Sequence, residues 1–108
     1  MSMPALQRFE HDTGAFADFE AAALAAGFDD ALVRDWAAGL EIDTHTHPFA
    51  VQARVVRGEV WLSVGGETHH LSAGHGFTLA QGEPHTERYG ADGATFWVAR
   101  RRGPVVAA

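Results

Sequence analysis

The chain has 108 residues, a hydrophobic fraction of 46% and a formal net charge of −6, values that fit one globular domain with a single core. It contains no cysteine and no lysine, which excludes disulfides, thiol chemistry and Schiff-base catalysis by lysine. The acidic charge does not favour binding to nucleic acid, and no apolar run is long enough to cross a bilayer. Because the N-terminus lacks the basic and apolar regions of a secretion signal, we expect a cytoplasmic protein.

The first predicted element is a short helix over residues 14–26, a stretch rich in alanine and other helix formers. Asp12 or Thr13 is placed to cap its N-terminus, and Gly27 is placed to end it. Two phenylalanines and an alanine recur at helical spacing within it. We therefore expect one amphipathic helix that packs on the rest of the protein.

After the helix the pattern changes to that of β-structure, with short segments rich in valine, aromatic residues and threonine between glycine-containing turns. These segments are 31–37, 51–56, 59–64, 67–71, 76–80 and 94–100. Gly65 and Gly66 form a good two-residue hairpin turn, since glycine tolerates a positive φ. We predict a single all-β domain, made of an N-terminal segment with its helix (1–30), a β-barrel (31–102) and a C-terminal tail (103–108).

The stretch DTHTHPFAVQ, residues 43–52, contains a pair of histidines. On a strand, residues two apart point to the same face, so His45 and His47 can aim both imidazoles at one point. Imidazole is a ligand for zinc, iron, nickel and copper. Taken alone, the pair fits a metal site and two solvated histidines about equally well.

A second stretch, AGHGFTLAQGEPHTERY at residues 73–89, gives the pair a context. Together with THTHPFAVQARVVRGEVWL at residues 44–62, it resembles the two motifs of the cupin superfamily over roughly residues 30–100. The first motif is matched by the histidine pair and Gly58. The second is matched by Gly74, Phe77, Leu79, Gly82 and His85.

The resemblance implies a small, RmlC-like cupin jelly-roll β-barrel. It also implies that His45, His47 and His85 converge on one divalent transition metal, which the sequence does not identify among iron, copper, manganese, nickel and zinc.

The sequence departs from the cupin pattern at the usual glutamate ligand. The position seven residues before Gly58 holds Val51, and Gln52 comes one residue late. Gln52 then points away from the histidines unless a bulge re-aims it, so it is the weaker candidate ligand. Glu87 follows His85 by two residues and shares its face on an uninterrupted strand. Glu87 is therefore a candidate fourth ligand or general base, or else an outward carboxylate paired with an arginine.

Aromatic residues supply the candidate walls of a substrate pocket. Most of them are expected in the core, and Phe49, immediately after the histidine pair, is the first candidate for the pocket, followed by Phe77 and Trp97. Tyr89 stands where the cupin motif usually ends in asparagine, which would put a phenol near the pocket mouth. The other four histidines, His11, His69, His70 and His75, are expected at the surface.

Two functions remain open. The first is a metal-dependent enzyme, an oxidoreductase of the oxygenase type, that acts on a small organic molecule through the three-histidine site. The alternative is a stand-alone binding or sensor module for a small, sugar-like ligand, without catalysis. In either case we expect a homodimer, because open-edged barrels of this size often cover an edge by pairing.

Overall fold

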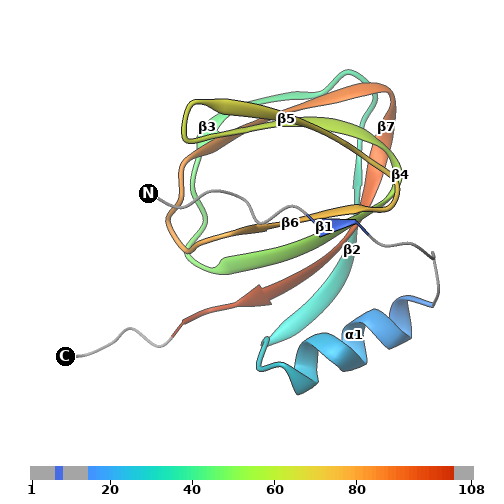
Figure 1. Ribbon diagram of the computed structural model, residues 1–108, viewed down its shortest axis with the longest axis vertical. Helices are drawn as coiled ribbons and strands as arrows, with labels where there is room; N and C mark the ends of the chain where they lie inside the picture. Colours follow the sequence, from blue (N-terminus) through green and yellow to red (C-terminus); the bar gives the residue numbers. More distant parts are fainter. Residues whose placement is uncertain (1–6, 9–14, 104–108) are drawn as a thin grey trace.

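The computed structural model describes residues 7–8 and 15–103 of the chain. In chain order the elements are β1 (Gln7–Arg8), α1 (Phe16–Ala25), β2 (Asp30–Trp36), β3 (Glu41–His45), β4 (Ala50–Val64), β5 (Glu67–Ser72), β6 (His75–Leu79) and β7 (His85–Arg101). Figure 1 shows the strands closing around a common interior, with α1 outside the barrel beside β2. The all-β barrel with one short N-terminal helix is confirmed. Within the described residues, no helix is long and apolar enough to span a membrane.

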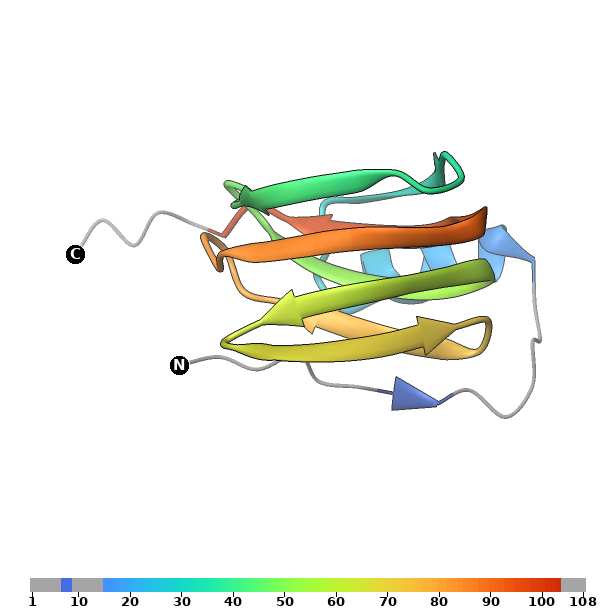
Figure 2. The same cartoon turned by 90° about the horizontal axis from the view of Figure 1, so that it is seen from above.

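Two long strands form the centre of the barrel. β4 and β7 pair antiparallel along most of their length, and the strand order is β1-β6-β4-β7-β2, with β5 on β4 and β3 on β7. In Figure 2 these strands lie side by side, aligned roughly along one axis of the molecule. The predicted segments 51–56 and 59–64 are thus parts of one strand, β4. β4 turns into β5 through Gly65 and Gly66, whose φ angles of 61° and 83° confirm the predicted hairpin turn.

Two glycines let β4, β7 and β2 approach one another closely. Gly58 has a φ of 77°, and a Cβ atom there would lie 2.0 Å from the carbonyl oxygen of Gly93. Gly93 has a φ of 69°, and its Cβ would lie 2.2 Å from the carbonyl oxygen of Trp36. The β4–β7 register also shifts next to Gly58. A side chain at either glycine would push the strands apart, so the barrel depends on both.

The core follows from the alternation of side chains along the strands. On β4 the inward residues are Val51, Ala53, Val55, Val60, Leu62 and Val64, all buried. On β7 the buried side chains include Tyr89, Phe96 and Val98. The same alternation turns His85 and Glu87 inward, where they are the buried polar residues of the described chain.

Helix α1 covers part of the outer face of the barrel. The ring of Trp97, on β7, lies 5.9 Å from that of Phe16 and 5.8 Å from that of Phe19. The helix begins at Phe16, after an N-cap at Ala15 that makes no side-chain capping bond, and Gly27 follows its end with a φ of 97°. The cap predicted at residues 12–13 lies outside the described residues. The helix therefore packs against β2 and β7, with aromatic contacts to Trp97.

Candidate metal centre

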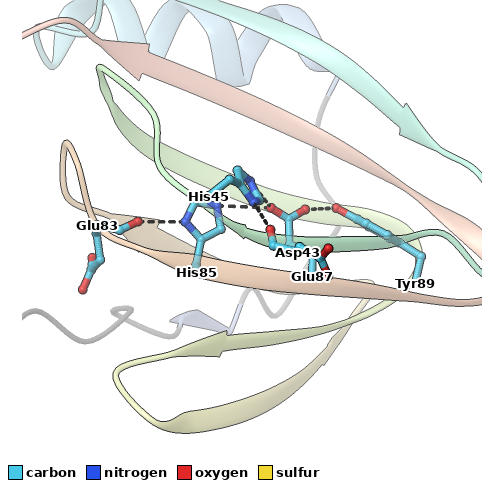
Figure 3. A network of polar contacts seen from close by, with 6 residues as sticks. All are labelled: Asp43, His45, Glu83, His85, Glu87 and Tyr89. Atoms are coloured by element: carbon cyan, nitrogen blue, oxygen red, sulfur yellow. Dashed lines mark hydrogen bonds and ion pairs between the residues drawn. The ribbon is translucent and has the colours of Figure 1, made fainter.

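Three histidines and one glutamate converge at one place inside the barrel. Each of His45, His47, His85 and Glu87 offers a ligand atom, and these atoms all lie within 4.8 Å of one another. His45 ends β3 and pairs in register with His85, the first residue of β7. Figure 3 shows His45, His85 and Glu87 pointing toward one another. The structure thus brings together the four side chains that the sequence singled out as the strongest candidates.

His47 reaches the cluster from outside a strand. β3 ends at His45, so the expectation that both histidines share one strand face is wrong. The connection from β3 to β4 contains Pro48, whose backbone has no N–H to donate to a ladder. The ring of His47 nevertheless lies 4.9 Å from that of His45 and 5.2 Å from that of His85. It stacks on Phe49 at 5.0 Å, which fixes its plane.

Backbone carbonyl groups set the tautomers of two of the histidines. His45 Nδ1 lies 2.8 Å from the carbonyl oxygen of Asp43, and His85 Nδ1 lies 2.9 Å from that of Glu83. A carbonyl oxygen only accepts, so in each ring Nδ1 carries the hydrogen and donates it. In the neutral ring Nε2 is then left with a free lone pair. Histidines that bind metals in proteins are commonly held in this way.

The two Nε2 atoms face the same carboxylate oxygen. Glu87 Oε2 lies 3.4 Å from His45 Nε2 and 3.2 Å from His85 Nε2. His85 Nε2 is buried and makes no hydrogen bond among the described residues. Lone pairs of neutral rings and a carboxylate repel one another at this distance, so the cluster needs a cation at its centre, either a proton on a ring or a metal ion. Three imidazoles and one carboxylate are a donor set that divalent transition metals accept.

The protonation equilibria reflect this crowding. Burial pushes the pKa of Glu87 up, but the contacts from His85 and Tyr89 outweigh it and hold that pKa below its usual value. Burial lowers the pKa of His85, but the contact with Glu87, the hydrogen bond to the Glu83 carbonyl and the negative charges of both glutamates together outweigh it, so the net shift of this pKa is upward. Burial and the neighbouring histidines lower the pKa of His47. The cluster therefore holds a negative carboxylate against imidazoles of unequal basicity.

A cavity of about 90 Å³ opens beside the cluster. His47, His85 and Glu87 are among the polar residues that line it, and Phe49 and Phe77 are among the apolar ones. The two phenylalanines therefore lie where the sequence placed them, on the wall of a pocket. The cavity is largely apolar with a few converging polar groups, as small-molecule sites usually are.

Three predicted site residues lie elsewhere. Gln52 faces away from the cavity, because its neighbours Val51 and Ala53 face into it and no bulge intervenes. Trp97 packs on α1 instead of lining the cavity, since strand alternation turns it outward between two inward residues. Tyr89 is not at the pocket mouth: it is 2% exposed, and its hydroxyl donates a hydrogen bond to Glu87.

The sequence reasoning missed the contribution of β2. Leu32, Arg34 and Trp36 alternate along this strand and all three line the cavity. Their spacing of two was the available signal, because the segment had already been predicted as a strand. Trp36 also stacks on Tyr89 at 5.2 Å, so β2 supports the glutamate side of the cluster through that tyrosine.

The barrel and its inward histidines define a cupin-type protein. Residues 32–101 match the family of the AraC-like ligand binding domain. The chain therefore belongs to the AraC-like ligand binding domain family, which is a cupin-type domain, and the resemblance to the cupin superfamily is confirmed. No curated protein matches the chain.

Solved structures carry the same barrel. An RmlC-like cupin from Shewanella frigidimarina has a TM-score of 0.61 and 22% sequence identity, over 70% of this chain and 68% of that one. The DMSP lyase DddQ from Ruegeria pomeroyi has a TM-score of 0.62 and 26% sequence identity, over 73% of this chain and 40% of the lyase chain. YcfD, a ribosomal oxygenase from Escherichia coli, has a TM-score of 0.63 and 19% sequence identity, over 73% of this chain and 24% of the oxygenase chain. Because this chain spans less than half of the lyase and of the oxygenase, the likeness concerns the barrel.

Proposed function

We propose that His45, His47, His85 and Glu87 bind one divalent transition metal ion, and that the chain is a metal-dependent enzyme acting on a small organic molecule in the adjoining cavity. Oxygen activation is the first chemistry to test. The proposal is supported chiefly by the two histidines whose Nδ1 atoms donate to backbone carbonyls while their Nε2 atoms face Glu87. A bound divalent ion supplies a Lewis acid and, in the case of iron or copper, a site for oxygen.

The chain's own residues define what happens around that ion. Glu87 is placed to ligate the ion through Oε2, since its Oε1 is already bonded to the Tyr89 hydroxyl. Phe49 and Phe77 line the apolar part of the cavity and limit the entry of water. In this account Gln52 and Trp97 have no catalytic role, and Tyr89 positions Glu87.

Loading the purified chain with Fe(II), Cu(II), Mn(II), Ni(II) or Zn(II), and following oxygen uptake across small phenols, diketones and carboxylic acids, tests the enzyme proposal. We expect uptake with one redox metal and its loss in the His45→Ala, His47→Ala double variant. The matched control is His69→Ala, His70→Ala, which also removes two histidines but lies outside the cluster. Absence of oxygen uptake with every metal and substrate would contradict oxygenase activity.

A second candidate function is the binding of a small molecule without turnover. It is favoured by the family match, whose description is that of a ligand binding domain. A sugar-like ligand that raises the melting temperature of the metal-free chain, and is recovered unchanged after long incubation, would support this function. The lyase and the oxygenase among the similar structures favour chemistry in the same barrel.

A homodimer in the cytoplasm is part of the proposal. Among the described strands β2 pairs only with β7, so one of its edges has no strand partner within the described chain. The side chain of Val33 on this strand is 46% exposed. Light scattering should give a mass of two chains, and a mass of 11.6 kDa, that of one chain, would contradict the dimer.

A further inference from the structure

Two arginines line the cavity beside the metal cluster, and one of them is already paired with an acid. Arg100 donates to both carboxylate oxygens of Asp30, at 2.9 and 2.7 Å. Arg34 makes no ion pair or hydrogen bond within the part of the chain that the structure describes, and its guanidinium lies over the ring of Trp36, at 4.7 Å. The cavity therefore has one guanidinium whose hydrogen-bond donors remain available.

Strand β2 directs this guanidinium into the site. Leu32, Arg34 and Trp36 share the face that lines the cavity, and Arg34 is also exposed to solvent. Stacking on Trp36 restricts the side chain before any ligand arrives, so binding loses less conformational entropy.

The charges and size of the cavity select a kind of ligand. A single guanidinium presents a planar pair of donors, which matches the two oxygens of a carboxylate. The paired Arg100 is neutralised by Asp30, so Arg34 is the arginine among the described lining residues that is left to pair with an anion. The volume of about 90 Å³ corresponds to roughly three water molecules, which leaves room for a small hydrocarbon part.

We propose that the ligand of this cavity is a small organic carboxylate, bound through its carboxylate group by Arg34 with its hydrocarbon part against Phe49 and Phe77. This inference rests on the proposed function, because it names the substrate class of that same site. The carboxylate is held by the solvent-exposed Arg34, while the hydrocarbon part lies in the cavity that His47, His85 and Glu87 also line.

Matched ligand pairs in the full chain test this inference. Propionate with propionamide, and butyrate with butyramide, differ in charge but hardly in shape. Isothermal titration of the zinc-loaded chain should show each carboxylate binding at least about tenfold tighter than its amide. Arg34→Gln should weaken carboxylate binding by about tenfold to a hundredfold and leave the amides unchanged, whereas Arg34→Lys keeps the charge and should restore part of the loss.

Arg88→Gln is the matched control, because Arg88 also stacks on a tryptophan, 4.4 Å from the Trp61 ring, but does not line the cavity. The Arg88→Gln variant should bind both ligand pairs with the same affinities as the unchanged chain. The inference is overturned if no carboxylate binds, if carboxylates and amides bind equally, if inorganic phosphate binds more tightly than either carboxylate, or if Arg34→Gln and Arg88→Gln behave alike.

Zinc content separates this inference from the proposed function. Arg34→Gln should retain as much zinc per chain as the unchanged protein, because Arg34 is not part of the ligand cluster. If zinc is bound but carboxylates show no dependence on Arg34, the inference fails while the metal site stands. If the chain binds no zinc but still prefers carboxylates through Arg34, the metal proposal fails and the ligand class stands.

Discussion

The Tyr89 hydroxyl donates a hydrogen bond to Oε1 of Glu87, and both side chains lie on the inward face of β7 (Figure 3). This bond leaves Oε2 of Glu87 facing His45 and His85, at 3.4 and 3.2 Å. Tyr89 is held in turn by stacking on Trp36. Burial and the negative charge of Glu87 raise the pKa of Tyr89, which keeps the phenol protonated and able to donate. The tyrosine therefore fixes the orientation of the Glu87 carboxylate, with one oxygen turned toward the histidines.

Replacing Tyr89 by phenylalanine should weaken metal binding while preserving the fold. We expect zinc affinity to fall by about tenfold, since partners that orient metal ligands typically contribute that much. Unfolding free energy should fall by about 1–2 kcal/mol, because the buried carboxylate loses one donor. In the Glu87→Gln background the same replacement should have little further effect on zinc affinity. Equal affinity for zinc in Tyr89→Phe and in the unchanged chain would contradict this role.

The glycine at position 58 should tolerate no side chain. Gly58→Ala adds an atom 2.0 Å from a backbone oxygen at a φ of 77°. We expect a loss of about 2–5 kcal/mol in unfolding free energy, from overpacking and backbone strain together. Gly39→Ala is the control, since its φ is 68° but no atom lies within 4 Å of the added carbon. Urea denaturation should give a loss of only about 1 kcal/mol for the control. Similar losses in the two variants would contradict the role of close strand approach.

Trp97→Ala should separate stability from metal binding. The tryptophan packs on Phe16 and Phe19 of α1, outside the barrel. Its removal should lower the unfolding free energy by about 1–3 kcal/mol, less than for a fully buried tryptophan. Zinc affinity should stay within about twofold of the unchanged chain. A large loss of zinc affinity in a folded Trp97→Ala variant would show that the residue matters to the site after all.

Acid should weaken the contact between β2 and β7. The hydrogen bonds and charge of Arg100 hold the pKa of Asp30 below its usual value. Since the folded pKa is the lower one, this contribution to stability is fully present above the unfolded pKa of about 3.9 and is lost as pH falls through the folded pKa. Because the Asp30 side chain is partly exposed to solvent, the effect is at most about 1 kcal/mol.

Asp30→Asn removes the charge and should remove this pH dependence. Urea denaturation of both chains at a series of pH values should give a difference at pH 7 that disappears at strongly acidic pH. A difference that stays constant across the series would contradict the ion pair as its cause.

Much of the site was predictable from strand periodicity and motif spacing. The spacing of two between His85 and Glu87 correctly predicted a shared inward face, and the same rule argued against Gln52. His47 was predicted to converge with His45, but for the wrong reason. Its position depends on the connection around Pro48 and on stacking with Phe49, and neither follows from periodicity.

Other features depend on which element covers which face. Trp97 lies between the inward residues Phe96 and Val98, so the segment is apolar on both faces. When a helix covers the outer face of a strand, side-chain alternation alone does not tell which apolar residues line the pocket and which ones contact the helix. Similarly, the role of Arg34 requires knowing that β2 borders the cavity, because an arginine in a strand is usually solvated.

The central claim is that the three histidines and Glu87 bind one metal ion. X-ray absorption spectroscopy at the zinc edge, on the full chain loaded with one equivalent of zinc, tests it most directly. We predict a first shell of three imidazole nitrogens and one or more oxygens, with at most one imidazole left in the His45→Ala, His47→Ala variant and all three kept in the His69→Ala, His70→Ala variant. A zinc shell without imidazole, or an unchanged spectrum in the first variant, would contradict the account.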